Sequence, residues 1–289
     1  MLKIIINADD FGLNASVTEE TAMLIEKGLI SSATIMANGV CLNDVALIAK
    51  NHPEISYGVH ICLDEFESLT HNPVFVNNGI TDKDGFFIKG AIFEISDFNS
   101  ELLDALEKEI KAQIERILLL GIPISHIDSH HLVHTRIRKL VPLFFKVLDE
   151  YNIKKIRLGE ITNPFESIKE RFKPRRDNNT HVGTSTVNNG QGSSICGIFN
   201  KAIHHSKILC LQRLMNKEYK RHFITTDVFY YYSQFLDAVI NRNVKRYSSV
   251  ELMCHPGHPS VLYKEEICNI ERLSLKDHIE YQLISYNEL

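Results

Sequence analysis

The chain has 289 residues, 44% of them hydrophobic, which is enough to bury the core of one large α/β domain or of two small ones. A formal net charge of −4 without a dominant basic stripe argues against a nucleic-acid partner. No apolar run is long enough to cross a membrane. The six scattered cysteines lack a Cys-x-x-Cys pair, so we expect a cytoplasmic protein with reduced thiols.

The amino-terminal part of the chain alternates β-rich segments with helical patterns. In chain order we expect a strand at 3–7, a helix from Ser16 to Gly28, a strand at 32–37, a short helix at 44–51 and a strand at 56–60. Ser16-Val-Thr-Glu19 is a capping-box pattern, which predicts where the first helix begins. Segment 66–98 carries Asn-Gly and Asp-Gly turn signals and is predicted to hold a hairpin.

The rest of the chain continues this alternation. The expected elements are a helix at 101–120, a strand at 122–128, a helix at 137–151, and strands at 154–158, 222–226 and 249–254. Strands separated by helical segments imply parallel βαβ units, so the fold class is α/β. About seven such strands favour a (β/α) barrel over the alternative of an open doubly wound sheet. We interpret the polar residues 177–194 as a loop inserted in a single domain, 1–289.

Ionisable residues recur at or just after the ends of the predicted strands. In a parallel barrel the carboxyl ends of all strands open on one face, where active sites are built. Charges scattered over the surface would not favour that end repeatedly, so we expect an active site there. The residues concerned are Asp9, Asp10, His60, Asp128, His130, Arg157, Asp227 and His255.

The densest of these groups is the segment 126–134, which packs four histidines and an aspartate into nine residues. Neutral imidazole is the commonest protein metal ligand, and a nearby carboxylate either ligates too or orients an imidazole from behind. This segment makes a metal-dependent enzyme the leading hypothesis.

Two local geometries compete within that segment. A helix would align His126, His130 and His134 in one stripe, whereas a strand puts 126, 128 and 130 on one face. Pro123 and the alternation that follows it favour the strand. His130 is then the best ligand, Asp128 supports it or faces the active site, His134 lies beyond the turn, and His126 lies deeper in the barrel.

Two further motifs flank the expected site. Asp9 and Asp10 are adjacent, and the alternation of a strand points neighbours in different directions, so one can bind a metal while the other faces the substrate. His255 precedes Pro256 and Gly257, a sharp turn that holds its side chain at the barrel rim. A histidine with a pKa near neutrality is suited to protonate a leaving group.

Together these motifs resemble the YdjC-like carbohydrate deacetylases, a family that includes the chitooligosaccharide deacetylases. The resemblance covers residues 3 to about 258, in order and spacing. The motifs that carry it are Asn7-Ala-Asp9-Asp10-Phe-Gly12, Gly58-Val-His60, His126-Ile-Asp128-Ser-His130 and His255-Pro-Gly257. The resemblance implies an irregular (β/α) barrel with a divalent metal at the strand ends.

Residue by residue, the resemblance implies that Asp10, His60 and His130 bind the metal, either Mg²⁺ or Zn²⁺. Asp9 is then the implied general base and His255 the implied general acid.

Other positions match the family more loosely or depart from it. Arg157 and Asp227 match positions that are commonly polar in the family. Together with Asp128 and His134, they are expected to contact substrate or support the site. The chain departs from the family at Leu132, where a histidine is common, and at Gly159, where an Arg-Leu-Pro stretch is usual.

The expected reaction is metal-assisted hydrolysis of an N-acetyl group on an amino sugar or a short chitooligosaccharide, with release of acetate. A small carbohydrate is therefore the expected partner, and the resemblance also admits a homo-oligomer. One rival is a barrel metallohydrolase of another bond, such as a phosphoesterase. A second rival is a sugar-binding protein that keeps a metal without turnover.

Overall fold

The computed structural model describes residues 1–159, 210–232, 243–259 and 279–289, together with single positions 235, 263, 264, 267 and 270. The polar insertion expected at 177–194 lies outside the described residues. None of the helices described is both long and apolar enough to span a membrane.

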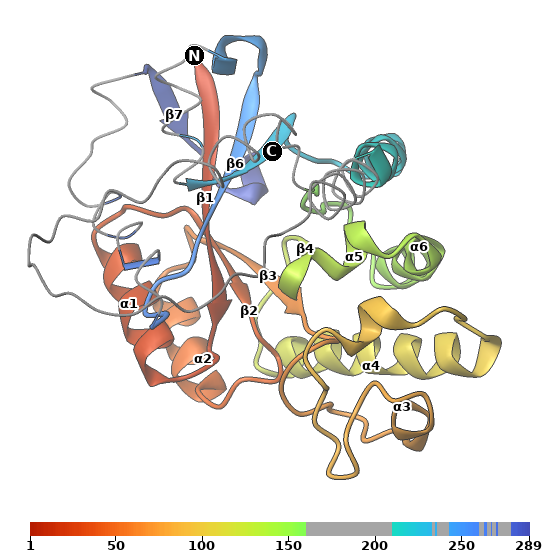
Figure 1. Ribbon diagram of the computed structural model, residues 1–289. Coiled ribbons are helices and arrows are strands. Elements are labelled where there is room, and N and C mark those ends of the chain that lie inside the picture. The colour runs from red at the N-terminus through yellow and green to blue at the C-terminus, as the bar shows by residue number, and fades with distance from the viewer. Residues whose placement is uncertain are drawn as a thin grey trace, which may run out of the picture.

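A curved parallel sheet forms the centre of the molecule (Figure 1). Its strands run in the order β4-β3-β2-β1-β6-β5, and β7 pairs with the amino end of β1. Isolated parallel bridges from Ile127 to Ile156 and from Lys155 to Ile224 continue the sheet from β4 towards β5. The strands are β1 (Leu2–Phe11), β2 (Ser32–Ile35), β3 (Ser56–Ile61), β4 (Ile127–Ser129), β5 (Val228–Tyr231), β6 (Ser249–Cys254) and β7 (Tyr281–Leu283).

Helices cover the outside of this sheet (Figure 1). The α-helices with both ends among the described residues are α1 (Ala15–Glu26), α2 (Leu42–Asn51), α3 (Pro73–Asn77), α4 (Ser100–Leu119), α5 (Val133–Arg136) and α6 (Val141–Glu150). Residues 210–222 are also helical. Short 3-10 turns lie at Ala91–Glu94, His130–Leu132, Arg138–Leu140, Asn243–Arg246 and Tyr286–Glu288. The helix α4 buries Leu102, Leu106, Ile110 and Ile117 at helical spacing, in agreement with the helix predicted at 101–120.

The α/β barrel-like fold with about seven strands is confirmed, but several boundaries differ from those expected. The predicted strand 154–158 forms only isolated bridges, and the strand predicted at 222–226 lies instead at Val228–Tyr231. The long helix α6 begins only at Val141, because Pro142 fits the first turn of a helix but would break an earlier one. The strand β7 was not expected.

The start of α1 also differs from the prediction. The helix begins at Ala15, and its N-cap is Asn14, whose side chain accepts a hydrogen bond from the backbone N–H of Val17 at 3.0 Å. Asparagine and serine are comparably good N-caps, so Asn14 could cap the helix as well as the predicted Ser16. The Ser16 hydroxyl instead donates to the carbonyl oxygen of Gly257 at 3.1 Å and ties α1 to the loop after β6.

The two faces of β1 have different neighbours. Ile4 and Ile6 belong to the large core between sheet and helices, whereas Ile5 packs with Ile284 and Tyr286 in a separate small cluster inside the barrel. This cluster fills the end of the barrel where the strands begin. The opposite end of the barrel interior, where the strands finish, is therefore not filled by this cluster, and polar side chains line it.

Candidate active site

The end of β1 turns both of its aspartates toward one cavity. Along β1, Ile5 lies in the interior cluster, so strict alternation also places Asn7 and Asp9 inside and would point Asp10 outward. A register shift between Ala8 and Phe11 interrupts the pairing with β2, and Asp10 has a left-handed φ of 62°. Such a bulge re-aims a side chain, so Asp10 lines the cavity beside Asp9. The expectation that the two acids face different ways is wrong for this reason.

A buried guanidinium organises the carboxylates under the cavity. Arg157 is 0% exposed, and its Nη1 and Nη2 donate to the two oxygens of Asp9 at 2.6 and 2.7 Å. Its Nε donates to Glu251 at 2.7 Å, and Nη1 lies 2.7 Å from an oxygen of Asp128. Burial opposes the charge, but these carboxylates, led by Asp128, raise the pKa of Arg157. The cation therefore stays charged and holds three acids in fixed places.

The imidazole of His60 is fixed from behind by a carboxylate. Its Nδ1 lies 2.7 Å from Asp128 Oδ1, and because a carboxylate only accepts, the ring nitrogen donates. Its Nε2 then faces Asp10 Oδ1 at 3.3 Å. Burial alone would lower the pKa of His60, but the acids around it, led by Asp128, raise it to about 9. Burial likewise opposes ionisation of Asp10, yet the charges of His60, His130 and His255 lower its pKa.

The turn after β4 carries His130, which lines the same cavity. The rings of His60 and His130 lie 5.8 Å apart at 78°. On its far side, His130 Nδ1 contacts Asp64 Oδ1 at 3.0 Å, and His131 Nδ1 contacts Asp64 Oδ2 at 2.6 Å. Burial opposes ionisation of Asp64, but these two hydrogen bonds lower its pKa to about 2.

The structure thus gathers most of the predicted residues around a cavity of about 150 Å³. Its wall contains the predicted metal ligands, the predicted base and His255, which follows β6 directly. The rings of His255 and Tyr263 lie 4.2 Å apart. Predicted site residues in this wall are Asp9, Asp10, His60, His130 and His255.

Two predicted residues lie elsewhere. Asp227 precedes β5 instead of following a strand, so it lies at the amino end of the sheet, where its carboxylate accepts the backbone N–H groups of Ser248 and Ser249. Its expected place beside the active site is wrong. His134 is fully buried, with Nδ1 at 2.6 Å from the Ser129 hydroxyl and Nε2 donating to the carbonyl of Arg157 at 3.0 Å. It braces the turn and does not line the cavity.

The donors around the cavity fit a cation at Asp10 and His60. Asp10 Oδ1 is buried and has no hydrogen-bond partner among the described residues, yet it faces His60 Nε2. A ligating histidine usually donates its other N–H to a carboxylate, as His60 does to Asp128. His130, whose Nδ1 is held by Asp64, lines the same cavity, with its Nε2 3.8 Å from Glu65 Oε2.

Tighter clusters of donor atoms exist, but each is already satisfied within the protein. Asp9, His60 and Asp128 bring donor atoms within 4.8 Å of one another, as do Cys62, Asp64 and His130. Arg157 neutralises Asp9 and Asp128 in the first cluster, and the ring N–H groups of His130 and His131 occupy Asp64 in the second. A further cluster joins Glu65 to the same two histidines, and there Lys89 Nζ donates to both oxygens of Glu65 at 2.9 and 3.1 Å. We therefore favour Asp10 and His60 as the core of a metal site.

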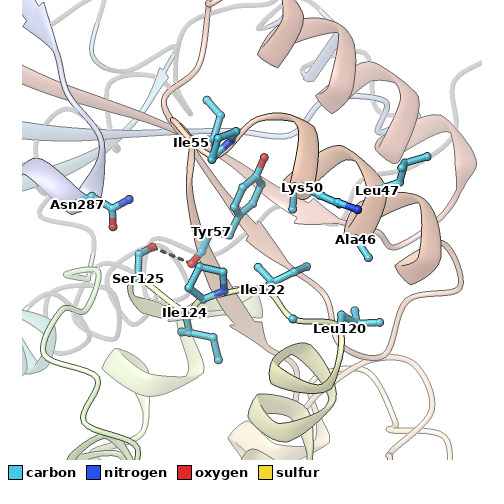
Figure 2. Close-up of a pocket in the computed structure, with 14 residues that line it drawn as sticks. Ala46, Leu47, Lys50, Ile55, Tyr57, Leu120, Ile122, Ile124, Ser125 and Asn287 are labelled. Carbon is cyan, nitrogen blue, oxygen red and sulfur yellow. Dashed lines mark hydrogen bonds between the residues drawn. The ribbon is translucent and has the colours of Figure 1, made fainter.

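A larger cavity of about 700 Å³ lies at the opposite end of the strands and is not the candidate site. Figure 2 shows its wall, with Ile55, Tyr57, Ile122 and Ile124 around it and Lys50 at the side. Lys50 is the one charged residue in this wall, so the cavity offers no pair of acids, bases or ligands for catalysis.

The sequence analysis missed three acidic residues that shape the site, of which Asp64 and Glu251 are buried and Glu65 is half-buried. Asp64 and Glu65 follow β3 by a few residues, and Glu251 lies in the middle of β6. The signal for Glu251 was available, because a glutamate inside the apolar stretch Val250–Cys254 is buried only when it is paired. Asp64 gave no such signal, since it lies in an acidic loop.

The chain is similar in sequence to known proteins. A sequence model of the family described as YdjC-like protein matches residues 3–286, which confirms the resemblance seen in the motifs. A carbohydrate deacetylase of Vibrio campbellii is 26% identical over 287 residues, covering 98% of this chain and 88% of the relative. A carbohydrate deacetylase of Brevibacillus brevis is 32% identical over 152 residues, covering 53% of this chain and 58% of the relative.

Among solved structures, an Enterococcus faecalis protein described as a cellobiose-phosphate cleavage protein superposes with a TM-score of 0.66. The two chains are 20% identical, and the match covers 99% of this chain and 98% of the other. At this identity the likeness supports the fold alone.

Proposed function

This chain belongs to the YdjC-like protein family, and on that premise we propose that it is a metal-dependent carbohydrate deacetylase that releases acetate from an N-acetylated amino sugar. The observation that carries the proposal is the pairing of Asp10 Oδ1, buried and without a hydrogen-bond partner among the residues described, with His60 Nε2 at 3.3 Å. Asp9 and His255 line the same small cavity, as a base and an acid for hydrolysis would have to. The deacetylases among the relatives support the reaction class.

The metal would be bound by Asp10, His60 and His130, with Asp128 and Asp64 holding the two imidazoles from behind. A bound divalent cation would polarise the acetyl carbonyl and lower the pKa of a water molecule beside it. Nitrogen and carboxylate donors suit Zn²⁺, and Mg²⁺ is the alternative.

Asp9 is the proposed general base. Its Oδ1 accepts from Asn7 and Arg157, whereas Oδ2 accepts one hydrogen bond, from Arg157, among the described residues. A carboxylate oxygen has about two lone pairs, so Oδ2 keeps one for a water proton. The ion pair with Arg157 fixes the orientation of the Asp9 carboxylate at the cavity.

His255 is the proposed general acid, which would protonate the departing amine. It follows the end of β6 and lines the same cavity as His60 of β3. The resulting products are acetate and a free amino sugar. We take a short chitooligosaccharide as the substrate and allow for self-association of the chain.

The test is acetate release from N,N'-diacetylchitobiose and from N-acetylglucosamine. Protein stripped of metal is compared with protein restored with Zn²⁺ or Mg²⁺, beside the variants Asp9→Asn and Asp227→Asn. We expect metal-dependent acetate that is lost in Asp9→Asn and kept within about twofold in Asp227→Asn, because Asp227 lies at the other end of the sheet.

Each rival function predicts a different result. A phosphoesterase would release phosphate from p-nitrophenyl phosphate and no acetate from either sugar. A sugar-binding protein without turnover would bind the sugar, with no acetate in the wild type. Absence of a bound metal after incubation with Zn²⁺ would remove the basis of the proposal.

A further inference from the structure

The turn that carries His130 has an unusual backbone. His131 and Leu132, directly after it, have left-handed φ values of 49° and 58°. Two consecutive residues with a Cβ rarely adopt this conformation, because it costs free energy that surrounding contacts must offset. The turn therefore needs a specific interaction to hold it.

Asp64 supplies that interaction. Its side chain is fully buried, with Oδ1 at 3.0 Å from His130 Nδ1 and Oδ2 at 2.6 Å from His131 Nδ1. One carboxylate thus bridges two neighbouring rings, whose centroids lie 3.9 Å apart. An ionised carboxylate can only accept, so both Nδ1 atoms must carry the protons.

The loop that carries Asp64 is itself fastened to α4. Gln113 of α4 accepts from the backbone N–H of Cys62 at 2.9 Å and donates to its carbonyl at 2.7 Å. Glu109, one helical turn earlier, accepts the backbone N–H groups of Leu69 and Thr70 at 3.0 and 2.9 Å. These contacts fasten the loop to α4 on both sides of Asp64, which gives its carboxylate a rigid base.

We propose that Asp64 is a positioning residue that holds the His130–His131 turn, keeps the proton of His130 on Nδ1 and so presents the lone pair of Nε2 to the cavity. Only the ligand role of His130 in this statement rests on the proposed function. The fixed tautomer follows from the contacts of Asp64 alone.

Asp64 is not the ligand of a second metal in this assignment. Both of its oxygens already accept ring N–H groups, and the Cys62 thiol donates to the carbonyl of Glu65 at 2.9 Å. A cation between Cys62, Asp64 and His130 would have to displace all of these hydrogen bonds.

The first test is the tautomer of His130 in metal-free protein, read from the ¹⁵N chemical shifts of its ring and assigned with a His130→Gln variant. The wild type is expected to show a protonated Nδ1 and an unprotonated Nε2. In Asp64→Ala we expect this fixed pattern to be lost, while Asp97→Asn, an exposed aspartate changed as a control, keeps it. An unchanged Nδ1–H tautomer in Asp64→Ala would overturn the proposal.

The second test is zinc affinity by competition with a chelator, because loss of a carboxylate behind a ligating histidine typically weakens binding by about 10–100-fold. Asp64→Asn is measured as well, in case the alanine variant fails to fold. Its amide oxygen can still accept a hydrogen bond from one ring, so we expect an intermediate loss of zinc affinity. A changed tautomer with unchanged zinc affinity would overturn the ligand role of His130. Two zinc ions per chain, one lost in Cys62→Ser, would overturn the positioning role.

Discussion

Arg157 and Asp9 form a two-pronged ion pair, with Nη1 and Nη2 at 2.6 and 2.7 Å from the two carboxylate oxygens and neither side chain more than 2% exposed. The same guanidinium also holds Asp128 and Glu251. Because Asp128 in turn orients His60, one buried cation sets the positions of the proposed base and of one proposed ligand.

Replacing Arg157 with glutamine should therefore be severe. The change leaves three carboxylates buried without their cation, and loss of one partner of a buried ion pair typically costs about 3–5 kcal/mol. We expect a lower urea midpoint and no measurable acetate release. Arg138→Gln, at an exposed arginine, serves as the control, and a midpoint for Arg157→Gln equal to that control would contradict the role of Arg157.

The two adjacent aspartates should respond differently to the same substitution. In Asp10→Asn we expect the bound metal to be lost, because the amide oxygen carries no full charge to face the cation. In Asp9→Asn we expect metal to be retained within a few-fold and turnover to fall by about 10²–10⁴-fold, the usual contribution of a general base. Metal content by atomic absorption, measured beside acetate release, separates the two roles. Equal metal loss in both variants would show that Asp9 is a ligand.

A buried histidine outside the cavity predicts a pH dependence of stability. Burial lowers the pKa of His134 to about 4, whereas the unfolded chain titrates near 6.5. Between pH 6.5 and about 4, His134 binds a proton in the unfolded state but not in the folded state. The free energy of unfolding therefore falls as the pH falls through this range. The slope from this group is at most about 1.4 kcal/mol per pH unit. His126, lowered by burial to about 3, acts in the same direction.

His134→Gln tests this, since the glutamine amide can still donate to the carbonyl of Arg157. Urea unfolding at pH 5 and pH 7 should show a smaller difference in free energy for the variant than for the wild type. The same difference in both proteins would place the origin of the pH dependence elsewhere.

Gly58 on β3 should not tolerate a methyl group. A Cβ at this position would lie 2.6 Å from Cε1 of His126, whose ring stacks on Tyr286 at 3.6 Å between centroids. Overpacking of this kind typically costs about 1–3 kcal/mol. We expect Gly58→Ala to lower the melting temperature, and the double variant with His126→Ala to show a favourable coupling. Purely additive effects would contradict this steric cause.

Much of the site could be predicted because it follows from chain direction alone. In this sequence a polar residue follows directly after several apolar strands, and the carboxyl ends of parallel strands open on one face of a barrel. Asp9, His60 and His255 could therefore be predicted to lie on that face, and they line one cavity. Asp227 shows how fragile that reasoning is. A shift of the strand from 222–226 to Val228–Tyr231 moved this residue from the end of a strand to its beginning.

What could not be predicted depends on backbone irregularity and on pairing across the fold. The left-handed φ of Asp10 comes from a bulge between β1 and β2, which the amino-acid sequence around it does not predict. The role of Asp64 exists only because the turn after β4 folds back toward the loop after β3. Likewise Glu109 and Gln113 read as the polar side of an amphipathic helix, yet both are fully buried against that loop.

The position of β1 also bears on how the chain is made. This strand is synthesised before the other strands described, but it pairs with β6, where Lys3 lies opposite Ser249, and with β7, where Leu2 lies opposite Tyr281. During synthesis its run Ile4-Ile5-Ile6 therefore has one edge without a partner, the kind of surface on which nascent chains aggregate. Barrel closure must come late and over long sequence separations, so we expect slow refolding that improves with dilution or with a chaperone that shields the amino-terminal strand.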